Sequence, residues 1–139
     1  MQTTCGVLIT DGTNLLVCHP TNGAKWDIPK GKQDLGEDDI TTACRELWEE
    51  TGLTVNPNFL TPLGIYPYKL GKQLSLFLNL VSVMPDVKKL VCNSYFETKD
   101  GKKLPEMNAY KVVPYSEAML MLNADMCRVI KPLLDNIST

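Results

Sequence analysis

The sequence lacks the features that mark several large classes of protein. Its five cysteines are odd in number, widely scattered and without a CxxC pair, which argues against a disulfide framework and a structural zinc site. Neither sign of charge dominates, because 14 basic and 16 acidic residues leave a net charge of -2, so a general nucleic-acid-binding surface is not expected. The N-terminus has no basic leader region, and the longest apolar runs, such as residues 74–83, are too short to cross a bilayer. These absences predict a cytoplasmic protein that binds a small molecule and no membrane.

The length and the patterning predict one α/β domain over residues 1–139, since no repeat, low-complexity segment or linker divides the chain. Strands are expected at residues 3–10, 15–19, 64–68, 74–83, 90–97 and 109–113. The first two strands should form a hairpin around DGTN, and KDG at residues 99–101 is a second turn signal. A helix is expected over residues 38–52, and one or two more over 115–137. This order of elements predicts a mixed sheet held between helices.

The stretch RELWEE, residues 45–50, crowds three carboxylates into six positions. On a helix, Glu46, Glu49 and Glu50 fall within an arc of about 100°, while the apolar residues occupy the other side. Such acidic faces are often simply solvated. However, like charges repel one another, and a single arginine, Arg45, does not neutralise three glutamates. Because hard divalent cations take oxygen ligands of this kind, the pattern also fits a magnesium or manganese site.

A longer stretch decides between these interpretations. Residues 31–53, GKQDLGEDDITTACRELWEETGL, resemble the signature of the Nudix hydrolases: Gly, five residues, Glu, seven residues, Arg-Glu-apolar-any-Glu-Glu-any-Gly-apolar. The matching positions are Gly31, Glu37, Arg45, Glu46, Leu47, Glu49, Glu50, Gly52 and Leu53. The resemblance implies an α/β/α sandwich with a mixed β-sheet. It also implies hydrolysis, with Mg²⁺ or Mn²⁺, of a nucleoside diphosphate linked to another group.

The same resemblance implies roles for individual residues. The metal ligands it implies are Glu46, Glu49, Glu50 and a backbone carbonyl near Lys30 or Gly31. Arg45 belongs with Glu49 and Glu50 to the implied catalytic group, and Arg45 and Glu37 are expected to brace the loop and orient the glutamates.

Related enzymes often add a later glutamate as a ligand or general base. Glu106 is the preferred candidate for this role and Glu97 is its rival. The alternative for both is an ordinary surface carboxylate.

The substrate is less sharply defined. The motif WDIPKG, which contains Trp26 and Lys30, resembles the entry to the signature in diadenosine and diphosphoinositol polyphosphate hydrolases. Tyr68 lies where dinucleoside polyphosphate hydrolases keep a tyrosine that could stack on a base, and Tyr66 on the same strand face is the fallback. Pro67 instead resembles the proline of ADP-ribose pyrophosphatases, and Trp26 fits stacking on a base and anchoring of its loop equally well.

A dinucleoside polyphosphate is therefore the leading expectation for the small-molecule nucleotide substrate. Nucleoside triphosphates, ADP-ribose and an RNA 5′ end, the one nucleic-acid partner considered, are alternatives. A non-catalytic Nudix-fold module that binds a nucleotide is the other class of function. The sequence does not indicate the oligomeric state.

Overall fold

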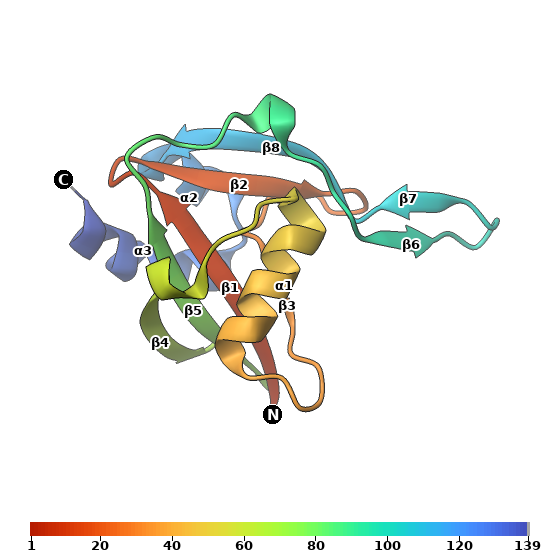
Figure 1. The fold of residues 1–139 in the computed structure, drawn as a ribbon, viewed down its shortest axis with the longest axis horizontal. Coiled ribbons are helices and arrows are strands. Elements are labelled where there is room, and N and C mark those ends of the chain that lie inside the picture. Colours follow the sequence, from red (N-terminus) through yellow and green to blue (C-terminus); the bar gives the residue numbers. More distant parts are fainter. Residues whose placement is uncertain (139) are drawn as a thin grey trace.

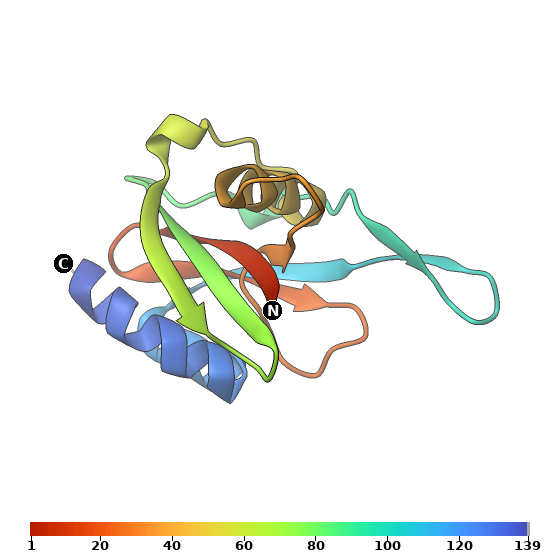
Figure 2. The same cartoon turned by 90° about the horizontal axis from the view of Figure 1, so that it is seen from below.

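The computed structural model describes residues 1–138, which form a sheet between two layers of helix. The six-stranded sheet has the order β4-β5-β1-β2-β8, with β3 paired to β1 (Figure 1). Its strands are β1 (Gln2–Thr10), β2 (Asn14–Pro20), β3 (Lys30–Lys32), β4 (Thr61–Pro67), β5 (Lys72–Leu80) and β8 (Met107–Pro114). Helix α1 (Asp39–Thr51) covers one face, and α2 (Tyr115–Met121) and α3 (Ala124–Ile137) cover the other, as Figure 2 shows. The expected α/β/α sandwich with a mixed sheet is confirmed.

Strand β1 is the centre of the sheet. It pairs in parallel with β5 over its whole length, from Gln2 opposite Lys72 to Thr10 opposite Leu80, whereas the other pairs are antiparallel. Alternate side chains of β1 enter two cores: Val7 and Ile9 pack towards α1, and Leu8 packs towards α2 and α3. The hairpin of β1 and β2 is present, but β2 pairs over most of its length with β8.

Local signals set the ends of α1. The Asp38 side chain accepts the backbone N–H of Thr41 at 3.0 Å, which caps the first turn. Gly52 ends the helix with a φ of 77°, a left-handed conformation that glycine adopts without a steric penalty. No helix among residues 1–138 is long and apolar enough to span a membrane.

The expectation of one strand over residues 90–97 is wrong. Only β6 (Tyr95–Glu97) is a strand, and it pairs with β7 (Lys103–Pro105) around the expected turn at residues 99–101. The preceding backbone bonds to α1 instead, because Val91 N–H donates to Thr51 O at 3.1 Å and Asn93 N–H donates to Glu49 O at 2.6 Å. Strand β3 and two 3₁₀ turns, Pro57–Phe59 and Val87–Lys89, were also not expected.

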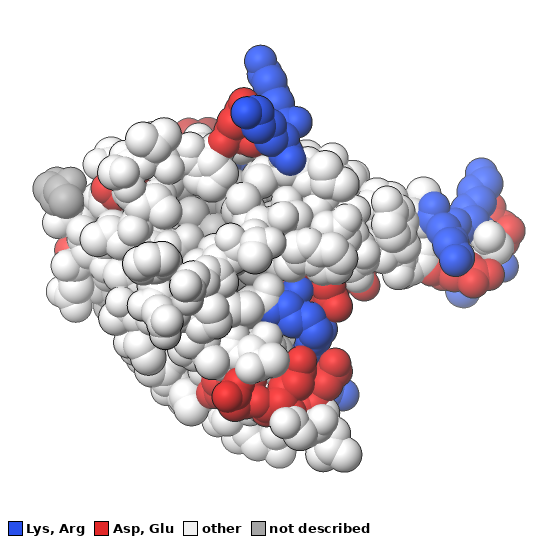
Figure 3. Space-filling view, viewed as in Figure 1, with Lys and Arg blue, Asp and Glu red and all other residues white. Residues whose placement is uncertain are grey.

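Strands β6 and β7 form a two-stranded ribbon, residues 95–105, that we call the arm. The arm projects from the sandwich in both views (Figures 1 and 2). In Figure 3 the tip of the arm is densely charged, and the surface is hollowed between the arm and the charged side chains of the body.

Candidate active site

Strand β3 lies directly under the acidic face of α1. Its glycine, Gly31, pairs with Cys5 of β1, and a Cβ atom at Gly31 would overlap the carboxylate of Glu46. A residue with any side chain is therefore excluded at this position unless Glu46 moves. The Glu46 side chain itself is only 12% exposed.

Glu50 is held at both ends. Its carboxylate Oε1 accepts the backbone N–H of Lys30 at 3.1 Å, and its backbone carbonyl accepts the Tyr110 hydroxyl at 2.5 Å. The residue is 4% exposed, although glutamate is ionised in water at neutral pH. Sequence reasoning identified Glu50 but missed Tyr110, which lies 60 residues later on β8 and has no local signal.

Arg45 connects the remaining carboxylates of the signature. Its Nε and Nη2 donate to the two oxygens of Glu37 at 2.8 and 2.9 Å, and its Nη1 donates to Glu46 at 2.8 Å. The same Nη1 lies 3.2 Å from both oxygens of Glu49. Glu37 also accepts from Thr42 Oγ1 and from the backbone N–H of Asp34. These bonds tie the loop before α1 to the helix.

The carboxylates differ sharply in their electrostatic environments. Burial raises the pKa of Glu50 to about 9, and burial together with the charge of Glu49 raises the pKa of Glu46 to about 7. Hydrogen bonds from Arg45 lower the pKa of Glu37 to about 2. Negative charge is therefore stabilised at Glu37 and costly at Glu46 and Glu50.

The donor chemistry of this cluster fits a hard divalent cation. Carboxylate oxygens are the preferred ligands of Mg²⁺ and Mn²⁺, and a cation would offset the unfavourable charge of Glu46 and Glu50. Within residues 1–138, however, no three acidic, histidine or cysteine side chains converge on one point. Glu46 and Glu49 bond to Arg45 Nη1 instead, so they would have to give up some of these hydrogen bonds to coordinate a metal ion.

The C-terminal end of α1 is held by residues that precede and follow the arm. The last four carbonyls of a helix have no partner within the helix, and here each has a donor. Asn93 donates twice, from Nδ2 to Trp48 O at 3.1 Å and from its backbone N–H to Glu49 O. The Tyr110 hydroxyl donates to Glu50 O, and Val91 N–H donates to Thr51 O. The backbone positions of Glu49 and Glu50 thus depend on distant segments of the chain.

The two candidate later glutamates lie in different surroundings. Glu106 follows the arm and is half-buried. Its backbone N–H donates to Ser94 O at 2.9 Å, and Ser94 directly follows Asn93, which caps α1. Glu97 lies in β6 opposite Lys103 and is exposed on the arm. This placement brings the backbone of Glu106 near the C-terminal end of α1, whereas Glu97 lies on the arm.

Lys30 and Trp26 are both held by neighbouring groups. Lys30 Nζ bonds Asp27 Oδ2 at 2.8 Å; burial alone would lower the Lys30 pKa, but the Asp27 carboxylate outweighs it and the pKa rises. Sequence reasoning missed Asp27. The ring of Trp26 packs on the core, with Lys111 Nζ 5.2 Å from its centroid and the His19 ring centroid at 5.1 Å. These contacts favour the anchoring role of Trp26.

Tyr66 and Tyr68 are half-buried against the core beneath α2 and α3. The Tyr66 hydroxyl donates to Leu63 O, and the Tyr68 hydroxyl accepts from Asn123 Nδ2 at 3.2 Å. Lys69 Nζ lies 5.4 Å from the centroid of the Tyr68 ring. Tyr66 is therefore turned inward, while Tyr68 stands at the end of β4 beside a cation.

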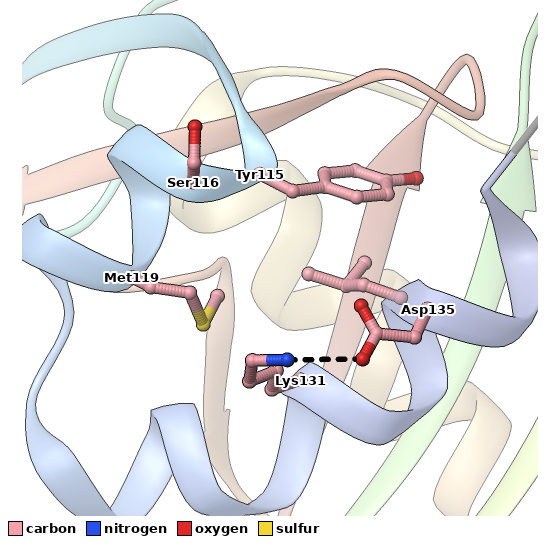
Figure 4. Close-up of a pocket in the computed structure, with 6 residues that line it drawn as sticks. Tyr115, Ser116, Met119, Lys131 and Asp135 are labelled. Atoms are coloured by element: carbon pink, nitrogen blue, oxygen red, sulfur yellow. Dashed lines mark hydrogen bonds and ion pairs between the residues drawn. The ribbon is translucent and has the colours of Figure 1, made fainter.

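A separate small hollow lies between α2 and α3, on the opposite side of the sheet from α1. It has a volume of about 190 Å³ and is lined by residues that include Tyr115, Met119 and Leu134, with the Lys131–Asp135 ion pair of 3.0 Å at its rim (Figure 4). None of the signature carboxylates lines it, so it is not part of the candidate site.

Comparison with known proteins agrees with this architecture. An uncharacterized 17.7 kDa protein from the e-segB intergenic region of Enterobacteria phage T4 is 35% identical over 112 residues, covering 78% of this chain and 74% of that protein. An RNA pyrophosphohydrolase from Roseobacter denitrificans is 56% identical over a shorter stretch of 36 residues, 26% of this chain and 21% of that protein.

A solved C. elegans Ap4A hydrolase has the same fold, with a TM-score of 0.67 at 20% identity, covering 99% of this chain and 98% of that one. The family description that fits the sequence is the NUDIX domain, and the match extends over residues 1–134. The chain therefore belongs to the NUDIX domain family.

Proposed function

We propose that this Nudix hydrolase cleaves a phosphoanhydride bond in a dinucleoside polyphosphate, in the cytoplasm and with Mg²⁺ or Mn²⁺. The observation that carries the hydrolase function is the cluster in which Glu37, Glu46 and Glu49 surround Arg45 while Glu50 bonds the backbone beside Gly31. A surface that was merely solvated would have no reason to bury Glu50 and to place Gly31 against Glu46.

The residues divide the work as follows. Glu46, Glu49, Glu50 and the Gly31 carbonyl would hold the metal, which compensates phosphate charge and lowers the pKa of a water molecule. Arg45, fixed on both oxygens of Glu37, orients Glu46 and Glu49. Glu106 is the candidate base for the proton of the attacking water.

Two observations support the choice of substrate. Tyr68 stands at the end of β4 with Lys69 Nζ 5.4 Å from the centroid of its half-buried ring, which could take a base, and the fold is shared with an Ap4A hydrolase. A second candidate substrate is an RNA 5′ end, which the 36-residue similarity to an RNA pyrophosphohydrolase favours.

The test is a panel assay that measures the release of phosphate, pyrophosphate and AMP from dinucleoside polyphosphates, nucleoside triphosphates, ADP-ribose and a triphosphate-ended RNA. We expect Glu49→Gln to lower kcat by roughly 10²-fold or more, because it removes a charge that matters most in the transition state. Glu117→Gln is the matched control, since Glu117 is an exposed glutamate on α2. Equal activity of the wild type and Glu49→Gln would contradict the hydrolase assignment at this site.

A further inference from the structure

A groove with no assigned role lies at the root of the arm. It has a volume of about 370 Å³ and is lined by Pro20, Asn22, Gly23, Phe96 and Glu106. This size falls in the range of about 300 to 1,000 Å³ that is typical of sites for small ligands. One wall is the loop after β2, and the other is formed by β6 and the residue after β7.

Backbone bonds join this groove to the end of the catalytic helix. Glu106 N–H donates to Ser94 O, and Glu106 O accepts Thr21 N–H, both at 2.9 Å. The neighbouring residue Asn93 donates to Glu49 O at 2.6 Å. The groove therefore begins beside the end of α1 that carries the carboxylates, and both of its walls are fixed to that end.

The lining favours an uncharged heterocycle. Phe96 offers an aromatic ring, and the Asn22 amide can both donate and accept hydrogen bonds. No lysine or arginine lines the groove, so it lacks the donors that phosphate requires. A base with its ribose fits this set of groups, whereas a phosphate chain fits the cation-binding cluster next to it.

We propose that this groove binds one nucleoside of a dinucleoside polyphosphate and that Phe96 stacks on its base. This proposal rests on the proposed function. The arm then acts as the element that distinguishes two-ended from one-ended nucleotides.

Phe96→Ala tests the proposal, with Tyr95→Ala as its matched control. The two aromatic residues are neighbours on β6, so their side chains point to opposite faces of the ribbon, and Tyr95 does not line the groove. For Phe96→Ala we expect kcat/KM on diadenosine tetraphosphate to fall by about 5- to 150-fold, mainly through KM, as for the loss of a stacked base. Hydrolysis of ATP, which has no second nucleoside, should stay within about twofold of the wild type.

Asn22→Ala is a second, independent variant, because Asn22 lies on the loop after β2 and not on the arm. We expect it to lower kcat/KM for diadenosine tetraphosphate by about 5-fold, the effect of losing one hydrogen bond, and to have no such effect on ATP. Equal losses on both nucleotides, or equal effects of Phe96→Ala and Tyr95→Ala, would overturn the proposal in favour of a structural role for the arm. A selective loss on triphosphate-ended RNA would overturn it in favour of RNA.

The two levels of proposal fail differently. If the wild type and Glu49→Gln are equally active, the hydrolase function is wrong. If the wild type cleaves none of the dinucleoside polyphosphates, the substrate choice is wrong. If Glu49→Gln is inactive while Phe96→Ala and Asn22→Ala match the wild type on diadenosine tetraphosphate, only the groove is wrong.

Discussion

Glu50 combines burial with an ionisable side chain, and its surroundings supply little positive charge. The Lys30 backbone N–H is one donor to a carboxylate with two oxygens, and the Lys30 ammonium is already bonded to Asp27. The energetic cost of ionising Glu50 is therefore met only if a cation binds nearby. A residue of this kind is a poor contributor to stability and a good contributor to a metal site.

In the presence of EDTA we expect the free energy of unfolding to decrease as pH rises from about 5 to 9. The folded pKa values, about 9 for Glu50 and about 7 for Glu46, both exceed the ordinary value of 4.5. Between these limits the folded state binds more protons than the unfolded state, so raising the pH favours unfolding. Thermal melts at several pH values measure this, and Glu50→Gln should remove most of the decrease above pH 7.

Millimolar magnesium should reverse this trend, because a ligand that binds only the folded state stabilises it by RT ln(1 + [L]/Kd). The gain should be largest at high pH, where the carboxylates are most strongly ionised. Melting temperatures that are independent of both pH and magnesium would contradict this account of Glu46 and Glu50.

At the scale of elements, the C-terminal end of α1 links the site to the rest of the fold. Tyr110 of β8 and Asn93 before the arm donate to the carbonyls of Glu50 and Glu49. Small shifts of either donor would move two signature glutamates together.

Tyr110→Phe should therefore lower kcat several-fold in addition to its cost in stability. Tyr115→Phe is a matched control, because the Tyr115 hydroxyl also makes a single hydrogen bond, at 2.6 Å to Thr10 Oγ1, on the far side of the sheet from α1. Both variants should lose about 1 kcal/mol of unfolding free energy, measured by urea denaturation. If both lose activity equally, the hydroxyl of Tyr110 has no special relation to the site.

The elements that sequence predicted well are those defined by local chemistry. Helix α1 has its N-cap at Asp38 and its C-cap at Gly52, so its limits can be read from neighbouring residues. Residues 90–94 carry an apolar pattern typical of a strand, but their N–H groups bond to α1, a choice that depends on tertiary structure. Strand β3 was missed for the same reason, since three residues become a strand only through pairing with β1.

At the scale of the whole molecule, the arm is the least supported part of the fold. A two-stranded ribbon has only marginal stability unless it packs against other elements, and the arm projects from the body. We expect trypsin to cleave first at Lys99, Lys102 or Lys103, as located by mass spectrometry of early fragments. Lys88 and Lys89 provide the comparison: they are also exposed but lie in a turn whose Val87 packs on the core. Earlier cleavage at that turn would show that the arm is firmly folded.

The candidate site was predictable where the signature is continuous in sequence. Helical spacing alone puts Glu46, Glu49 and Glu50 on one face, and the resemblance to the Nudix signature added Arg45 and Glu37. Tyr110, Asp27 and the groove at Phe96 were not predictable, since each acquires its role from contacts between segments that the chain brings together only on folding. Spacing within one helix was therefore enough to predict the acidic cluster, whereas the contacts around it were not predictable from local sequence.

The parallel pairing of β1 with β5 has a consequence for how the protein is made. Strand β1 is synthesised well before its partner along the whole length, β5 (Lys72–Leu80), because β2, β3, α1 and β4 lie between them in the chain. Until β5 has been synthesised, the edge of β1 at Val7 and Leu8 has no β5 partner. The β1–β5 ladder is therefore a late, non-local step of folding, because it cannot form before β2, β3, α1 and β4 have been made.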